Sequence, residues 1–196
     1  MTTGLWPFRP APFADELLTS WMTRLAHGHG LRPAGLLQIM QPACPDFAAL
    51  DWTTHRELLA LLAMRTGVSE RVVETLVLDF GSDPSLRDLL HHNWQGPALQ
   101  YCAGCLAEGV PYYRRSWRLA CFRVCPRHRT ALCDGCPYCG GTIRLDDLPP
   151  ARGLALCQNC GGGLVGRSEP QPPQSVLLEK LIDLEQRIAH TVLQKP

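Results

Sequence analysis

Apolar residues recur at helical spacing through the first hundred positions of the chain. After an extended lead-in that holds Pro10 and Pro12, the pattern predicts a helix that begins at an Asp15 cap and runs to about Ala26. Pro33 suits the first turn of a second, shorter helix, because its ring already holds a helical φ. The first half of the chain is therefore predicted to be mainly α.

Two further helices are predicted between residues 54 and 80. Thr54 and Glu57 have capping-box spacing at the start of the first one, since the hydroxyl and the carboxylate can each satisfy an orphan amide. Gly67 and a Ser69 cap separate it from a helix that we expect to reach Phe80. A helix, a short turn and a capped helix form a helix-turn-helix-like pair.

The second half has a different pattern, which divides the chain. Residues 99–168 are rich in cysteine and glycine, with short apolar runs that indicate a small α+β tandem of zinc-ribbon or treble-clef type. Residues 169–174 hold three prolines and predict an extended linker. A C-terminal helix over 175–193 follows, with an apolar stripe that the body of the protein or a partner must cover. The stripe consists of Leu177, Leu181, Leu184, Ile188 and Val192. We expect domains at 1–98 and 99–168, and a linker with one helix at 169–196.

Composition and charge narrow the class of protein. Apolar residues make up 45% of the 196 residues, enough to bury a core, and the net charge of +1 excludes a uniformly basic coat for nucleic acid. Residues 1–100 carry a net −3 and residues 101–196 a net +4, so a basic partner surface belongs to the second half. No apolar run approaches the ~20 residues of a membrane span, and residues 1–9 lack a signal-peptide pattern, so we expect a cytoplasmic protein. In that reducing compartment ten cysteines do not indicate a disulfide framework.

Cysteine and histidine spacing predicts two zinc sites. The four pairs with a two-residue spacer are Cys102/Cys105, Cys125/His128, Cys136/Cys139 and Cys157/Cys160. Such a spacer lets one tight turn aim both side chains at an ion about 2.3 Å from each sulfur, and two turns complete a tetrahedron. Sequential pairing predicts a three-thiolate, one-imidazole site and then a four-thiolate site, each holding a structural Zn²⁺. Four strong ligands leave no open position for a catalytic zinc, and redox or iron–sulfur chemistry fits this spacing less well.

One cysteine leaves the second set of ligands open. Cys133 also stands two residues before Cys136 and could replace Cys139 as a ligand. We favour Cys139, because Pro137 and Gly140 give it a complete knuckle. Two further cysteines, Cys44 and Cys121, are interpreted as small core residues.

A stretch without acidic residues lies between Glu108 and Asp134 and interleaves arginines with aromatic side chains. Arginine suits phosphate or carboxylate, and aromatic rings can stack on bases or on a partner. The competing interpretation is structural, since alternation over 118–124 predicts a strand with one buried face and Trp117 suits a core. The candidate partner or nucleic-acid residues are Tyr112, Tyr113, Arg114, Arg115, Trp117, Arg118, Arg123, Arg127 and Arg129.

The predicted helix over 69–80 is poorly suited to reading DNA. Glu70, Glu74 and Asp79 outnumber Arg71 and would face phosphate. We therefore interpret the helix pair as a packing or protein-docking unit. The sequence shows neither a nucleophile–base setting nor a glycine-rich phosphate loop, so we predict no enzyme activity and no catalytic residues.

Several segments together resemble the TniQ family of transposition proteins, which includes TnsD-like target selectors. The segments are, in order, the helix at 16–26, Leu-Ala-Met-Arg-Thr-Gly-Val-Ser at 62–69, Tyr-Cys-x2-Cys at 101–105, Tyr-Tyr-Arg-Arg-Ser-Trp-Arg at 112–118, Cys-Pro-x-His at 125–128 and Cys-Pro-x-Cys-Gly at 136–140. The ordered set spans about residues 5–165. Ala103 stands where a proline is common in the family.

The resemblance implies a target-selection adaptor rather than an enzyme. Family members link a target-recognition element to the AAA+ ATPase regulator called TnsC or TniB, and so to the transposase. In CRISPR-associated transposons that element is a guide-RNA effector complex on target DNA, in other members it is a DNA site, and some members are homodimers. Longer relatives carry further DNA-binding modules after the zinc region, so this chain resembles the small adaptor form. The alternative is a DNA-binding transcriptional regulator that uses the zinc ribbons and the helix-turn-helix.

Overall fold

The fold is mainly helical with small antiparallel sheets. The computed structural model describes residues 4–41, 43, 46–78, 80, 84–93, 96–166, 179–180 and 182–187. The described helices are α1 (Leu18–Gly28), α2 (Pro33–Met40), α3 (Arg56–Thr66), α4 (Glu70–Glu74) and α5 (Ala103–Ala107), with 3-10 turns at Ala48–Asp51, Pro84–Leu89 and Arg115–Arg118. The antiparallel pairs are β1 (His92–Asn93) with β2 (Gly96–Pro97), and β3 (Val124–Cys125) with β4 (Thr130–Ala131). This architecture confirms the predicted fold class.

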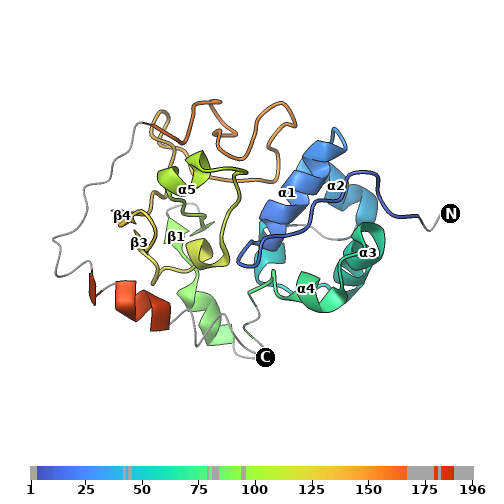
Figure 1. Ribbon diagram of the computed structural model, residues 1–196, viewed down its shortest axis with the longest axis horizontal. Coiled ribbons are helices and arrows are strands. Elements are labelled where there is room, and N and C mark those ends of the chain that lie inside the picture. Colours follow the sequence, from blue (N-terminus) through green and yellow to red (C-terminus); the bar gives the residue numbers. More distant parts are fainter. Residues whose placement is uncertain are drawn as a thin grey trace.

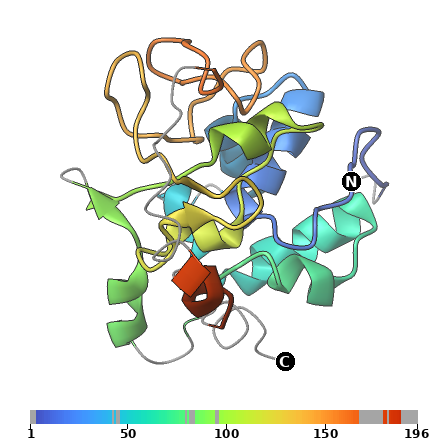
Figure 2. The ribbon, with the colours of Figure 1, turned by 60° about the vertical axis from the view of Figure 1, so that its left-hand side comes forward.

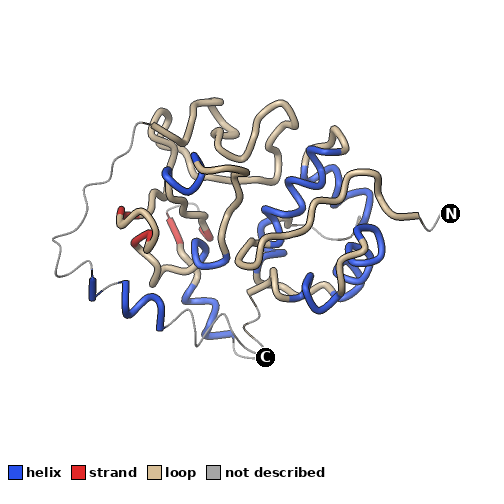
Figure 3. Tube along the Cα trace, viewed as in Figure 1, coloured by secondary structure: helices blue, strands red, loops and turns tan. Residues whose placement is uncertain are grey.

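The elements gather in two regions. Helices α1 to α4 lie together on one side of the molecule, and both small sheets lie on the other (Figures 1 and 3). One contiguous apolar core runs through both regions, from Leu17 to Leu164. The lead-in to α1 pairs with the second half: Glu16 and Arg114 form an antiparallel bridge, and the Leu17 amide donates to the Tyr113 carbonyl at 2.9 Å. The boundary at residue 98 stays a prediction.

The helix starts differ from those predicted. α1 begins after Leu17, and the Asp15 carboxylate accepts hydrogen bonds from Tyr112 and Arg114 instead of capping the helix. α3 begins after His55 with no side-chain cap, so the capping box at 54–57 is wrong. Ser69 does precede α4, but its hydroxyl makes no cap hydrogen bond. The Asp15 carboxylate thus binds side chains 97 and 99 residues away and not a backbone amide in the first turn of α1.

Two predicted elements are shorter than the periodicity implied. The helix expected to reach Phe80 is α4 and ends at Glu74; farther along, the Leu78 amide donates to the carbonyl of Asp51 at 2.7 Å. The strand expected over 118–124 is confined to its last residue, where β3 begins, because Arg118 ends a 3-10 turn and residues 120–121 form another turn; between them Leu119 pairs with Leu90 in an isolated bridge. In both places tertiary contacts override local pattern.

The C-terminal helix expected over 175–193 is described in part, and within that part it is helical. Residues 179–180 and 182–187 are helical, Ile182 is 9% exposed and Leu184 is 46% exposed. The body of the protein therefore covers Ile182, which the predicted stripe did not include, and leaves Leu184 uncovered. The other stripe residues, the prolines of 169–174 and Cys44 lie outside the described residues. None of the described helices is both long and apolar enough to cross a membrane.

Candidate metal centres

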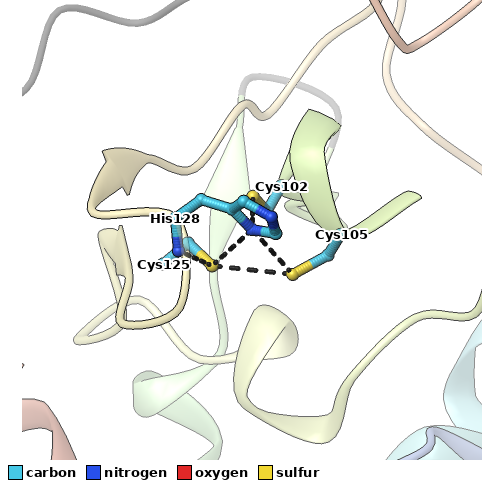
Figure 4. Close-up of side chains that lie close together, drawn as sticks. All are labelled: Cys102, Cys105, Cys125 and His128. Carbon is cyan, nitrogen blue, oxygen red and sulfur yellow. Dashed lines mark hydrogen bonds between the residues drawn. The ribbon is translucent and has the colours of Figure 1, made fainter. Parts of the chain in front are cut away.

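Four predicted ligands converge from two separate turns to form the first cluster. Cys102 immediately precedes α5 and Cys105 lies within it, while Cys125 ends β3 and His128 follows in the turn before β4. Figure 4 shows the three sulfurs and the imidazole pointing toward one another. The His128 Nδ1 atom lies 3.4 Å from the Cys102 and Cys105 sulfurs and 3.6 Å from the Cys125 sulfur.

These separations match the edges of a zinc tetrahedron. Donors that lie about 2.0 to 2.3 Å from one zinc ion are about 3.5 to 3.8 Å apart. The Cys105 and Cys125 sulfurs are 3.6 Å apart, and all four donor atoms of the cluster lie within 4.8 Å of one another. The first cluster thus offers a closed set of three sulfurs and one nitrogen, which fits zinc.

Polar groups around the first cluster orient its histidine and face its sulfurs. The Nε2 atom of His128 lies 3.0 Å from a carboxylate oxygen of Glu108, and Arg127 holds the other oxygen at 2.6 Å. A carboxylate on the outer nitrogen fixes the tautomer that leaves Nδ1 free to bind metal. An Arg114 guanidinium nitrogen lies 3.9 Å from the Cys105 sulfur, where its charge favours a thiolate. Glu108 belongs to no motif, and sequence reasoning missed it.

The second cluster is built from two copies of one turn. In the first turn the Cys136 amide donates to the Gly141 carbonyl, and the Gly140 amide donates to the Cys136 carbonyl, both at 2.9 Å. Cys157, Gly162 and Gly161 repeat this pattern at the same distances in the second turn. The four sulfurs of Cys136, Cys139, Cys157 and Cys160 lie within 4.8 Å of one another, with separations of 3.6 and 3.8 Å between opposite turns. This is again a closed tetrahedral donor set.

Glycine is required at both turns of the second cluster. Gly140 and Gly161 have φ of 65° and 74°, a left-handed conformation that L side chains rarely adopt. A Cβ atom on Gly162 would lie 2.7 Å from the Tyr138 ring of the opposite turn. Burial raises the pKa of the Cys136 thiol, whereas the amides of Cys139 and Tyr138 and the side chains of Cys160 and Cys157 lower that pKa, to about 7. The turn at 136–141 therefore brings amides toward the Cys136 sulfur and favours its thiolate.

Cys133 lies outside both clusters. Its amide and carbonyl pair with Tyr101 at 2.8 Å each, and its side chain packs against the main core. Cys121 also packs against that core, half-buried, as expected.

We predict that Cys139→Ser lowers the bound zinc from two ions to one, whereas Cys133→Ser retains both. Cys139 lies with the other three sulfurs and Cys133 does not. Native mass spectrometry counts the ions directly. Loss of an ion from the Cys133 variant with retention in the Cys139 variant would reverse the assignment of the fourth ligand.

Most of the candidate partner residues support the fold. Tyr113, Trp117 and Arg118 are at most 5% exposed, with the guanidinium of Arg118 bound to the buried Asp51 carboxylate. Tyr112 stacks on Phe13 at 4.3 Å between ring centroids.

The arginines divide into packed and exposed members. Arg114 pairs with Asp15, and the half-buried Arg115 donates its amide to the Asp15 carbonyl. Arg123, Arg127 and Arg129 are exposed, so any contact of this set with a partner falls mainly on them. The structural alternative holds for Trp117, whereas the burial of Tyr113 and Arg118 could not be inferred from their spacing.

The helix considered as a DNA reader is short. α4 has five residues, of which Glu70 and Glu74 are exposed acids. A helix of this length and charge is unsuited to the major groove.

A small α+β scaffold organised around two closed Cys/His clusters is the class of protein that this fold defines. The chain belongs to the TniQ family, whose profile matches residues 7–132, and that family is associated with transposition. The match includes the whole first cluster and ends before the second, so it is shorter than the 5–165 span inferred from the motifs. A search of curated proteins finds no match.

Proposed function

We propose that this chain is a non-catalytic adaptor that connects a target-recognition element to the AAA+ ATPase regulator of a transposition system. The observation that carries the proposal is the family match over residues 7–132. The closed clusters support it, because four donors around each ion leave no position for a substrate or an activated water.

We further propose that each cluster holds one Zn²⁺, with Cys102, Cys105, Cys125 and His128 as the first ligand set and Cys136, Cys139, Cys157 and Cys160 as the second. Cysteine sulfur and imidazole nitrogen are the donors that structural zinc prefers. Zinc binding at such sites is coupled to folding, so the ions would hold the second half in one shape. That role suits a protein whose task is to present surfaces.

The proposed partners are the ATPase TnsC or TniB on one side and a target element on the other. A guide-RNA CRISPR effector on target DNA is one such element, and a second copy of the chain is a further proposed component. Among the candidate residues, the exposed Arg127 is the one to test first for ATPase binding, because the buried members cannot reach a partner.

The test is co-purification of the chain with an AAA+ ATPase regulator of the TnsC or TniB type. We expect a stable complex on size-exclusion chromatography, and we expect Arg127→Glu to weaken it at least tenfold. Arg56→Glu is the matched control, since Arg56 is exposed on α3, away from the clusters. Zinc content is measured for each variant, so that loss of the first cluster is distinguished from loss of contact.

The regulator alternative is tested in the same preparation. Mobility shifts on random and cognate DNA at two salt concentrations separate specific recognition from charge-driven binding. Specific DNA binding by the chain alone, together with no ATPase complex, would overturn the adaptor proposal.

A further inference from the structure

The C-terminal helical segment, residues 179–180 and 182–187, binds the body of the protein through a buried carboxylate. The Oε1 atom of Glu185 accepts hydrogen bonds from the successive amides of Arg123 at 2.7 Å and Val124 at 3.2 Å. Glu185 is 3% exposed. Successive amides that converge on one oxygen form an anion-binding site in the backbone. Figure 2 shows this segment, in red, beside the yellow strand region.

Two more contacts lie on the same face of the segment. Ile182 packs on Val124 in an apolar cluster separate from the main core. Glu179 forms an ion pair with Arg129 at the surface. Residues 179, 182 and 185 follow one another at three-residue spacing, which keeps them on one side of a helix.

The opposite face of the segment is exposed. Asp183 and Arg187 pair with each other at 3.4 Å, with side chains about 70% exposed, and Leu184 is 46% exposed. The segment therefore docks through an acid–apolar–acid pattern, and its charges complement the arginines beside the β3–β4 hairpin.

We propose that the outer side of the β3–β4 hairpin is a docking site for an acidic amphipathic helix of a partner protein, and that residues 179–187 fill this site until the partner replaces them. The partner helix presents an aliphatic residue with an acidic residue three positions before it and another three positions after it. The receiving groups are the amides of Arg123 and Val124, the Val124 side chain and the Arg129 guanidinium.

The described contacts explain why the occupant can be exchanged. Among the described residues of the segment one aliphatic side chain, Ile182, is buried, in a cluster of two residues. Among the described residues no group donates to the second oxygen of Glu185, so its carboxylate is only half satisfied. The segment is tied to Gly166 through residues 167–178, so it competes through its high effective concentration rather than through a large interface. The proposal rests on contacts within the chain and not on the adaptor function.

The experiment uses the full-length chain and a fluorescent peptide of residues 175–196 as a stand-in for the partner helix. Ile182→Asp should release the segment from the hairpin, and fluorescence anisotropy should then show at least tenfold tighter peptide binding than to the unmodified chain. Leu184→Asp makes the same change on the exposed face and should leave binding as in the unmodified chain. Glu185→Gln in the full chain is a second, isosteric way to open the site.

Peptide variants test the carboxylate itself. A peptide with Glu185→Gln should bind the Ile182→Asp chain at least tenfold more weakly than one with Asp183→Asn. Equal binding of the two peptides, or no gain from either opening substitution, would overturn the proposal. Light scattering reports the remaining occupant: a dimer of the unmodified chain that dissociates on Ile182→Asp would mean that a second copy fills the site, and would also overturn it.

Discussion

Replacing Cys105 with serine is expected to remove one zinc ion. The resulting disorder should extend beyond the first cluster. A structural zinc site contributes about 10–16 kcal/mol in zinc-finger peptides, which rivals the 5–15 kcal/mol that stabilises a whole domain. Cys105 is 8% exposed and contacts Arg114, which in turn binds Asp15 at the entry to α1. The lost ion should therefore loosen the contact between the two regions as well.

Native mass spectrometry counts the zinc, and near-UV circular dichroism with a thermal melt measures the packing around the buried aromatic rings. Cys121→Ser is the control, because that cysteine is half-buried and belongs to neither cluster. It should keep two ions and melt within a few degrees of the unmodified protein. Two retained ions and an unchanged melt for Cys105→Ser would refute the assignment of the first site.

The substitution Asp51→Asn should lower the free energy of unfolding by about 3–5 kcal/mol, because it leaves a buried guanidinium without its counter-charge. The Arg118 Nε atom donates to Asp51 at 2.8 Å, and the Thr19 amide and hydroxyl also donate to that carboxylate. Burial raises the pKa of Asp51, while Arg118 and Thr19 oppose the shift. Urea unfolding gives the free energy.

A surface ion pair between the same two regions provides the comparison. Asp147 and Arg32 approach to 2.5 Å, with side chains 65% and 51% exposed. Exposed pairs contribute at most about 1 kcal/mol, so Asp147→Asn should have little effect on the urea midpoint. Equal losses of unfolding free energy for Asp51→Asn and Asp147→Asn would mean that burial does not set the contribution of the Asp51–Arg118 ion pair.

Sequence was sufficient for what depends on local spacing. A two-residue separation constrains both side chains of a turn, and the structure brings the predicted side chains together in the predicted groups of four. Pro33 likewise begins α2, as its fixed φ predicts.

What depends on distant partners could not be predicted. The arginine at 118 looked available for a ligand, but it is buried against an aspartate 67 positions earlier. Asp15 has cap spacing, but it binds Tyr112 and Arg114. The docked face of the C-terminal helix is set by Glu185, an acid that a hydrophobic pattern assigns to solvent. In each case the deciding contact spans 60 residues or more, where periodicity carries no information.

The strand-like pairing of the α1 lead-in with residues 113–115 has a consequence for any assembly that contains this chain. The segment that leads into α1 is hydrogen-bonded to the half of the chain that carries the clusters. Two partners, one bound to the helical region and one to the cluster region, would therefore be held at a constant distance from each other. Within the described part of the chain, we expect this pairing to keep the two regions at one separation and not to act as a hinge. Adjustment during complex formation would then have to come from the partners.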